Sequence, residues 1–319
     1  MKPRLILAAL AALAVALSAC GSSDDKKSSS SKSSSSPAAP AGQPGKGKPP
    51  ITFGDKNFTE QYILGELYAQ ALRAKGFTVK VKSNIGSSEI TDKALTSGKI
   101  DIYPEYTGVI VTELAGQKDQ PKSAEATYAD AKKYEESRGY ALLTATPFFD
   151  ADGLAVKPQY AKKNGLADVG DLKKVGAFKY GAPPENKTRY QGVVGMKKAY
   201  GLTALKFKPL AIGLQYKALE SDNIDVAAVF TTDAQLAGGK YTVLKDSKGI
   251  FGFQNVAPVV SKKVLAQQGP AFAETLNAVS AKLTNDAMQK MNGAVDLDKQ
   301  KPAAVAKTFL QANGLLAKS

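Results

Sequence analysis

The spacing of apolar residues predicts alternating strands and helices from residue 51 onward. An apolar period of two marks a strand with one buried face, and a period near 3.6 marks a helix with one apolar stripe. The first part of the chain has strand patterns at Ile51–Gly54, Phe77–Val81, Ile100–Tyr103 and Ala141–Ala145, and helix patterns over Ile63–Leu72, from Ser87 or Ser88 to Gly98, and over Lys122–Arg138. Strands that alternate with helices through short loops indicate a mainly parallel sheet.

The same alternation starts again near Phe148–Gly153. Further strand patterns lie at Leu154–Lys157, Phe178–Gly181, Leu205–Leu210, Ile224–Phe230 and Tyr241–Leu244, with helix patterns at Asp168–Val175, Thr188–Tyr200, Leu214–Leu219 and Asp233–Leu236. Ala257–Val260 returns as a strand, and nearly all residues from Ser261 on have helical spacing. The chain is therefore predicted to form an α/β fold of two units closed by helices.

The stretch Ile100–Gly108 places polar and aromatic side chains at the end of a predicted strand. Pro104 lacks a backbone donor, so we expect ladder pairing to stop there. Glu105, Tyr106 and Thr107 follow at the carboxyl end of the strand. Open α/β sheets bind ligands at the carboxyl ends of their strands. Tyr106 is accordingly a candidate cleft residue, and its alternative role is to cover the sheet edge.

A segment of the first unit resembles a segment of the second. Ala94–Ile102 aligns with Ala218–Val226, and without a gap Tyr106 falls on Phe230 and the Thr after it on Thr231. The match spans only about fifteen residues, so chance similarity between two helix–strand units is an alternative. If the repeat is real, each unit carries a ring followed by Thr at the same strand end. Facing units then bring the two rings to opposite walls of one cleft, which suits a flat, apolar or cationic ligand.

The N-terminus has the composition of a bacterial lipoprotein signal peptide. Cationic residues precede an apolar run, Leu5–Leu17, that is too short to span a membrane. Leu17–Cys20 resembles a lipobox, which implies cleavage before Cys20 and a lipid on its sulfur, and Cys20 is the only cysteine. Residues 21–50 lack large apolar side chains and are predicted to be a disordered tether. We therefore expect residues 1–20 to be a signal peptide and the protein to be extracytoplasmic and lipid-anchored to the cell membrane.

The net charge of +14 narrows the choice of partners. Seven Lys or Arg and two Asp lie in the first 50 residues, so the rest of the chain is basic in its own right. Such a surface favours anionic lipid headgroups or wall polymers. Nucleic acid is not an expected partner, because the lysines are scattered along the chain and the N-terminus directs the protein out of the cytoplasm.

The residue inventory points away from an enzyme. The chain has no His, one Cys and no Trp, which excludes His-based general-base catalysis and His metal ligation. The sequence has no Gly-rich phosphate loop and no Ser nucleophile elbow. A hydrolase or transferase with paired carboxylates is the alternative, but no such pair occurs at a telling spacing. We expect no cofactor and no metal, and an aromatic ligand site must be built from Tyr and Phe.

Five motifs resemble those of a known family. In chain order they are Gly54–Gln61, Gly86–Ile90, Ile100–Gly108, Gly181–Glu185 with Arg189, and Ala257–Val260. Together they resemble the substrate-binding proteins of ABC importers for glycine betaine, choline, carnitine and related quaternary-ammonium osmoprotectants. The resemblance runs from about Ile51 to near the C-terminus. It implies a two-lobed periplasmic-binding-protein fold, type 2-like, with an interlobe ligand cleft and two hinge crossings.

The resemblance also implies how the chain is divided and what it does. Lobe 1 is expected from residues 51–149 with 255–319, and lobe 2 from residues 150–254. A small solute is captured between the lobes and delivered to the permease subunits of an ABC transporter, and we expect a monomer. The alternatives are the same receptor role for a different cationic or amino-acid-like solute, and a non-transport surface-binding module.

The resemblance implies a set of ligand-binding residues. Family members hold a trimethylammonium group in a box of aromatic rings and bind a ligand carboxylate through Lys, Arg or hydroxyl donors. By position, Lys56 matches the family's first-lobe lysine, Tyr106 a box tyrosine and Arg189 the carboxylate-binding arginine of the second lobe. The predicted ligand-binding set is completed by Asn57, Thr59, Ser87, Ser88, Thr107, Asp150, Asp152, Tyr216, Phe230, Thr231 and Gln254.

The ring positions depart from the family pattern. Asp152 and Gln254 align with box aromatics, and Phe230 keeps the ring of a common tyrosine without its hydroxyl. A slip in the alignment by one or two residues places Phe149 or Phe253 in the box instead.

If the alignment holds, carboxylates take the place of missing rings. Asp152, together with Asp150, then meets the ligand cation by charge. Because a carboxylate pairs best with a cation that donates hydrogen bonds, this favours a solute with N–H groups over a fully methylated amine. A solvated loop or capping role for the two aspartates is the alternative.

Overall fold

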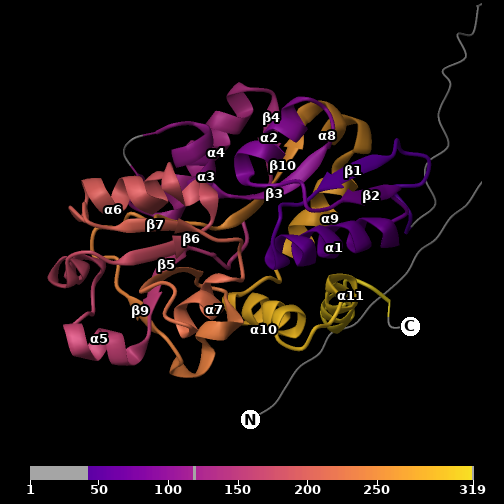
Figure 1. The fold of residues 1–319 in the computed structure, drawn as a ribbon. Coiled ribbons are helices and arrows are strands. Elements are labelled where there is room, and N and C mark those ends of the chain that lie inside the picture. Colours follow the sequence, from indigo (N-terminus) through magenta and orange to yellow (C-terminus); the bar gives the residue numbers. More distant parts are fainter. Residues whose placement is uncertain (1–41, 118–119, 318–319) are drawn as a thin grey trace, which may run out of the picture. The chain divides into compact units, whose positions relative to one another are not determined.

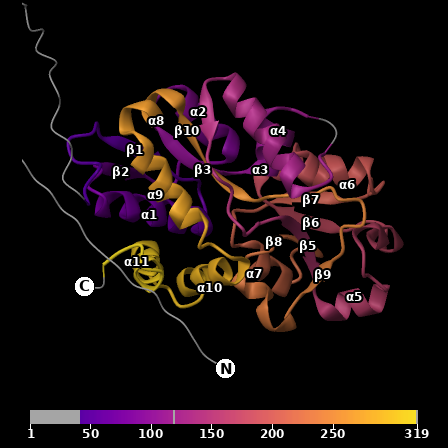
Figure 2. The same cartoon turned by 180° about the vertical axis from the view of Figure 1, so that it is seen from behind.

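The computed structural model describes residues 42–117 and 120–317, and its described elements belong to one compact unit, Ala39–Ser319. Figures 1 and 2 show the helices and strands from opposite sides. The predicted signal peptide, the lipid-modified Cys20 and the predicted tether up to residue 41 lie outside the described residues.

The first sheet joins the two ends of the described chain. Its strands are β1 (Ile51–Gly54), β2 (Val79–Lys82), β3 (Ile102–Tyr106), β4 (Tyr140–Leu142) and β10 (Val256–Ser261), in the order β2-β1-β3-β10-β4. β1 pairs in parallel with β2 and β3, and β10 runs antiparallel to β3 and β4. The C-terminal part of the chain thus completes a sheet that the N-terminal part begins. We call this sheet with its helices lobe 1.

The second sheet is built from the middle of the chain on the same plan, and we call it with its helices lobe 2. Its strands are β5 (Asp152–Val156), β6 (Lys179–Ala182), β7 (Lys206–Pro209), β8 (Val226–Phe230) and β9 (Thr242–Leu244), in the order β7-β6-β8-β5-β9. A bridge between Phe149 and Asn255 ties together the two segments that cross between the sheets. The predicted two-lobed α/β fold is confirmed.

Helices cover both sheets. Lobe 1 carries α1 (Thr59–Ala74), α2 (Ser88–Thr96), α3 (Thr107–Val109), the π-helix η1 (Ile110–Leu114), α4 (Ala124–Ser137), α8 (Lys262–Gln268), α9 (Pro270–Ser280), α10 (Asn285–Asp296) and α11 (Pro302–Ala312). Lobe 2 carries α5 (Pro158–Asn164), the 3-10 helices η2 (Val169–Val175), η3 (Pro184–Lys187) and η5 (Ala234–Gly239), the π-helix η4 (Tyr190–Val194), α6 (Gly195–Lys198) and α7 (Gln215–Glu220). α1 packs against α9, α10 and α11, so the first and last helices share one core (Figure 1).

β3 does not end at Pro104, which corrects the prediction that ladder pairing stops there. The strand continues to Tyr106, and Pro104 lies opposite Pro258 of β10. The carbonyl of Pro258 accepts from Leu143 N (2.9 Å), on the β4 side of its strand. N–H and C=O of one strand residue point to the same side, so the two prolines form a pair that exchanges no hydrogen bond. Neither missing donor interrupts the ladder between β3 and β10.

α1 begins without a side-chain cap, because extended Phe58 holds the capping position. The predicted helix over residues 188–200 is divided into η4 and α6, with Gly192 in a non-helical conformation (φ −119°, ψ −133°). A Cβ on Gly192 would lie 2.0 Å from the carbonyl oxygen of Asn186, so this close backbone packing requires glycine.

The last residues of the predicted tether are ordered. Gly45 is buried, and its N–H donates to Lys75 O (2.9 Å). Lys48 Nζ donates to Gln267 O (3.2 Å), and Gln268 Nε2 donates to Pro49 O (2.9 Å). Composition misses this because hydrogen bonds that involve backbone groups, rather than buried apolar side chains, hold residues 42–50 on lobe 1.

The internal repeat is structural. β3 and β8 hold the same place in their sheets, each between a parallel and an antiparallel neighbour. In the turn before each strand, Gly98 and Asp222 take the left-handed conformation (φ 70° and 58°). After each turn two successive N–H groups donate to one carbonyl, Ala94 O in lobe 1 and Ala218 O in lobe 2. The two aligned segments therefore share both their local structure and their place in the sheet.

Candidate functional site

A cavity of about 40 Å³ lies between the two lobes. It is lined from lobe 1 and the crossing segments by Lys56, Asn57, Phe58, Ser87, Ser88, Tyr106, Val109, Asp150 and Gln254, and from lobe 2 by Asp152, Pro183, Glu185, Asn186, Arg189, Ile212 and Phe230. Ten members of the predicted ligand-binding set are therefore together at one cavity. Thr59, Thr107, Tyr216 and Thr231 do not line it.

Three aromatic rings form one group at this cavity. The Phe58 ring stacks on Tyr106 (centroids 6.3 Å apart, planes at 20°) and on Phe230 (5.9 Å, 11°). Tyr106 and Phe230 come from the matching strand ends of the two lobes, and Phe58 lies between them. All three rings line the same cavity, and aromatic rings attract an organic cation.

Phe58 is the ring that sequence reasoning missed. It lies inside the motif Gly54–Gln61, at a helix start where Ser, Thr, Asp or Asn is favoured. A Phe at a helix start that normally holds a polar capping residue was the sequence signal that could have identified Phe58 as a site residue. The alternative alignments supply no ring: Phe149 and Phe253 are 45% and 38% exposed, and neither lines the cavity.

Lys56 places its own ammonium group against the rings. Its Nζ lies 4.2 Å from the Tyr106 ring centroid and 5.7 Å from that of Phe58. It also donates to Ser88 Oγ (3.1 Å) and forms a buried ion pair with Glu105. Burial lowers the pKa of Lys56, and the charge of Glu105 opposes that change. The ring face of Tyr106 thus already contacts a cation.

The Tyr106 hydroxyl is bound by a second buried carboxylate, that of Glu60. It donates to Glu60 Oε1 (2.8 Å), while Glu60 Oε2 accepts from Thr232 Oγ1 of lobe 2 (2.6 Å) and from Asn292 Nδ2 (3.0 Å). Burial raises the pKa of Glu60, and these hydrogen bonds oppose it. The ring of Tyr106 is therefore fixed in position by a buried network that joins the lobes.

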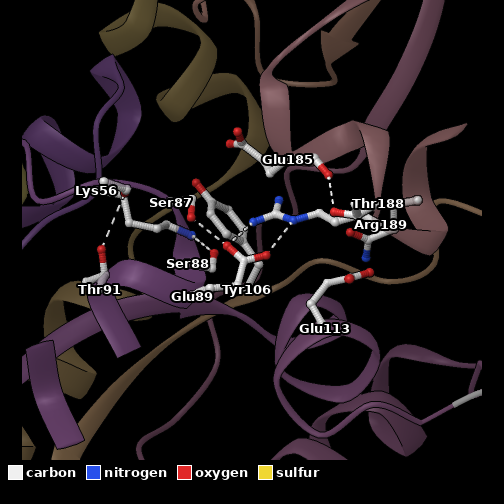
Figure 3. A network of polar contacts seen from close by, with 12 residues as sticks. Lys56, Ser87, Ser88, Glu89, Thr91, Tyr106, Glu113, Glu185, Thr188 and Arg189 are labelled. Atoms are coloured by element: carbon white, nitrogen blue, oxygen red, sulfur yellow. Dashed lines mark hydrogen bonds and ion pairs between the residues drawn. The ribbon is translucent and has the colours of Figure 1, made fainter. Parts of the chain in front are cut away.

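Arg189 enters the cavity from lobe 2 and meets Glu89 of lobe 1 (Figure 3). Its Nε donates to Glu89 Oε1 (3.0 Å) and its Nη2 to Glu89 Oε2 (2.9 Å). Ser87 Oγ donates to the same carboxylate (2.6 Å). Burial by itself raises the pKa of Glu89, but the bonds and charge of Arg189 outweigh it and lower that pKa to about 2. A guanidinium with this edge-on geometry is a carboxylate receptor.

The two predicted aspartates differ in what they do. Asp152 lines the cavity, and burial raises its pKa to about 6 against the opposing charge of Arg189. Asp150 Oδ1 accepts from Thr232 N (3.2 Å), and burial, with the nearby Glu60 and Asp233, raises its pKa well above the usual range. Asp150 thus holds backbone, whereas Asp152 faces the cavity beside Arg189 and Asn186.

Gln254 supports the cavity wall through the backbone. Its Oε1 accepts from Val109 N (3.1 Å) and its Nε2 donates to Phe251 O (3.2 Å). A Cβ on Gly108 would lie 2.5 Å from Gln254 Nε2, so the amide fills the space beside that turn. No ring replaces it, and its hydrogen-bonding groups are used within the protein.

The four predicted residues outside the cavity bond to other protein groups. Thr59 Oγ1 donates to Asp296 Oδ1 (2.6 Å) and Tyr216 OH to Asp233 Oδ2 (2.5 Å), beside a neighbouring pocket of about 220 Å³. Thr107 Oγ1 donates to Phe253 O (3.2 Å), and Thr231 Oγ1 accepts from Ala151 N (3.0 Å).

Among the described residues, no group of three or more His, Cys, Asp or Glu is arranged to hold a metal ion. In the same residues, no helix is long and apolar enough to cross a membrane.

Comparison with known proteins gives a consistent family. The family model described as the substrate binding domain of ABC-type glycine betaine transport system matches residues 49–312. A glycine-betaine-binding protein of Pseudomonas aeruginosa is 34% identical over 83% of this chain and 88% of its own length. A carnitine transport binding protein of Listeria monocytogenes is 30% identical over 84% of this chain and 88% of its own length.

A solved structure agrees with these sequence matches. A crystal structure titled as a glycine betaine/carnitine/choline ABC transporter has a TM-score of 0.67 and 26% identity, and the match covers 83% of this chain and 99% of the other. The family resemblance found in the sequence is confirmed. The chain belongs to the family of substrate-binding domains of ABC-type glycine betaine transport systems.

Proposed function

We propose that this protein captures a small zwitterionic quaternary-ammonium solute of the glycine betaine or carnitine type between its lobes and delivers it to an ABC permease. The observation that carries the proposal is the pairing, in one cavity, of three rings (Phe58, Tyr106, Phe230) with the guanidinium of Arg189. The rings suit a methylated ammonium group, and the guanidinium suits a carboxylate. Relatives named for glycine betaine and carnitine support this choice.

The energetics of the two ends differ. A methylated ammonium has no N–H to donate, so its attraction to a ring face contributes about 0.5–2 kcal/mol per contact. A carboxylate on a guanidinium forms two charge-assisted hydrogen bonds, which are about twice as strong as neutral ones. The rings therefore provide affinity for the cation, and Arg189 distinguishes zwitterions from simple cations.

Capture requires the lobes to move. The cavity of about 40 Å³ has room for no more than a few water molecules, and a solute of this type needs more space. Rotation about the two crossing segments beside Phe149 and Asn255 opens the site with little change inside either lobe. The expected cycle is opening, solute entry and closure of lobe 2 onto the rings.

Proteins of this family work outside the cytoplasm as the solute-binding part of a transporter. We place this chain at the membrane through a lipid on Cys20, as a monomer, with permease subunits as its partner. The lipobox-like Leu17–Cys20 supports the anchor. Metabolic labelling with palmitate tests it: the full-length chain incorporates label and the C20S variant does not. Equal labelling of both contradicts the anchor.

Isothermal titration calorimetry on a panel of solutes tests the ligand class. We expect glycine betaine or carnitine to bind more tightly than choline, ectoine or proteinogenic amino acids. Binding of none of the quaternary amines contradicts the proposal.

A second ligand class has one specific observation in its favour. Asp152 lines the cavity with a carboxyl group, which prefers a cation that donates hydrogen bonds. Glycine betaine, dimethylglycine and glycine form a matched series of decreasing methylation. Affinity that rises as methyl groups are lost supports an amino-acid-like solute, and affinity that falls supports the rings.

A further inference from the structure

Glu89 binds Arg189 in the way that a solute carboxylate would. The two residues come from different lobes, Glu89 from the first turn of α2 and Arg189 from the segment just before η4. Two parallel hydrogen bonds, from Nε to Oε1 (3.0 Å) and from Nη2 to Oε2 (2.9 Å), join one edge of the guanidinium to both carboxylate oxygens. This is the bidentate arrangement by which arginine recognises a free carboxylate.

Glu89 can leave the ion pair more easily than Arg189 can. The Arg189 side chain is 13% exposed and lines the cavity, whereas the Glu89 side chain is 42% exposed. Ser87, the residue just before α2, donates another side-chain hydrogen bond to the Glu89 carboxylate (2.6 Å). Because its own side chain is partly exposed, Glu89 can turn into solvent and keep Ser87 as a hydrogen-bond donor.

A solute carboxylate and Glu89 compete for the same donors. The Nε–Nη2 edge of a guanidinium presents two parallel N–H groups, enough for one carboxylate. A zwitterion that binds there must break the pair with Glu89. A cation without a carboxylate does not compete for these donors, so the pair with Glu89 stays intact.

We propose that Glu89 is a specificity-determining residue of this receptor, acting as a built-in competitor for the carboxylate site at Arg189. It stays on Arg189 when the solute is a quaternary amine without a carboxylate, and it is displaced when the solute is a zwitterion. The inference rests on the proposed function, because it takes the same cavity as the solute site.

Charge balance explains why such a residue shifts specificity. With a choline-type cation at the rings, Glu89 neutralises Arg189 and reduces the repulsion between the guanidinium and the solute. With a glycine betaine-type solute, breaking the pair subtracts from the affinity. Glu89 thus raises affinity for the carboxylate-free cation and lowers it for the zwitterion.

The test is calorimetry on the full-length chain and its E89Q variant with glycine betaine and choline as matched probes. Glutamine keeps the size of the side chain and removes the charge. We expect E89Q to bind glycine betaine about three- to tenfold more tightly and choline about three- to tenfold more weakly, as suits a partly exposed ion pair. Changes of the same sign and size for both solutes overturn the inference.

Glu185 supplies the matched control. It lines the same cavity, and within the described part of the chain its carboxylate forms no ion pair. E185Q removes the same charge from the same cavity without freeing Arg189. We expect E185Q to lower the affinity for both solutes slightly. Opposite-sign effects in E185Q equal to those in E89Q show that overall charge, and not the pairing, sets specificity.

A final measurement separates this inference from the proposed function. If the wild-type chain binds neither solute, the proposed function fails, and the pairing is then judged without ligand. Spin labels on K133C in lobe 1 and K163C in lobe 2, both exposed positions, report the distance between lobes in a C20S background. The inference predicts a longer distance, or a broader distribution, in E89Q than in its parent. An unchanged distribution overturns it.

Discussion

The strand ends at Tyr106 in lobe 1 and Phe230 in lobe 2 share a scaffold but differ in chemistry. Each ring ends the third strand of its sheet order and is followed by Thr. Tyr106 is 5% exposed and its hydroxyl is bound to Glu60, whereas Phe230 is half-buried and has no polar group on its ring. The repeat places the rings, and the residues around each ring decide what it can do.

The crossing segments show the same division between scaffold and chemistry. Thr107 N donates to Asn255 O (2.9 Å) in lobe 1, and Thr231 N donates to Ala151 O (3.0 Å) in lobe 2. Each Thr therefore fastens its strand end to a segment that crosses between the lobes. Both threonines were predicted as ligand residues, but their positions instead suit them to hold the crossing segments beside the cavity.

Gln254 and Asp150, the polar residues next to the two crossing segments, also have matching roles. Gln254 accepts from Val109 N, and Asp150 accepts from Thr232 N. Sequence comparison with the family suggested that Gln254 replaces a box ring. The repeat explains it better, because both side chains support the backbone next to the ring-bearing strand end.

The largest expected effect comes from removing the guanidinium of Arg189, which lobe 2 supplies. R189A removes the bidentate carboxylate partner, and we expect glycine betaine or carnitine to bind at least 30-fold more weakly, since truncating one member of a hydrogen-bonded charge pair costs about 2–5 kcal/mol. Choline should lose less than about threefold. Calorimetry checks both, and equal losses for zwitterion and cation contradict a carboxylate role for Arg189.

The next effect separates the two rings. Y106A and F230A should each lower the affinity for the solute about tenfold, because each removes one aromatic ring that attracts the cation. Y106A should also lower the ligand-free Tm by more than F230A, because a buried aromatic ring lost to Ala costs about 3–5 kcal/mol. F207A, which removes a partly buried ring of lobe 2 outside the cavity, is the control for affinity. Equal Tm losses for Y106A and F230A would contradict the inference that the Tyr106 ring stabilises the ligand-free protein more than the Phe230 ring does.

The smallest effect concerns pH. Burial raises the pKa of Asp152 to about 6, above the value of about 3.9 for an unfolded chain. The folded protein therefore binds more protons between these values, and the contribution of Asp152 to stability, present below about pH 4, is lost as pH rises through about 6. D152N should raise Tm by a few degrees at pH 7.5 and leave it nearly unchanged at pH 4. A variant with the same shift at both pH values contradicts this titration.

The fold could be predicted from the sequence where local patterns decide it. The apolar periods located the strands, and the alignment of Ala94–Ile102 with Ala218–Val226 placed Tyr106 and Phe230 correctly on equivalent strand ends. The ladder through Pro104 was missed because it depends on which side of the strand the missing N–H faces, which only the paired strand reveals.

The site was partly predictable for a similar reason. Lys56, Tyr106 and Arg189 were predicted to lie at the cleft because they lie in motifs, and all three line the cavity. Phe58 and Glu89 lie in the same motifs, but their roles depend on partners far along the chain, Phe230 and Arg189. Burial and pairing between lobes are properties of the closed arrangement and leave no local pattern.

A crystal structure of the protein with its tightest-binding quaternary amine tests the two-ended site most directly. We predict the ammonium group within about 6 Å of the ring centroids of Phe58, Tyr106 and Phe230, and any solute carboxylate on the Nε–Nη2 edge of Arg189 with Glu89 displaced. A solute bound away from these rings, or a carboxylate that leaves the Glu89–Arg189 pair intact, contradicts it.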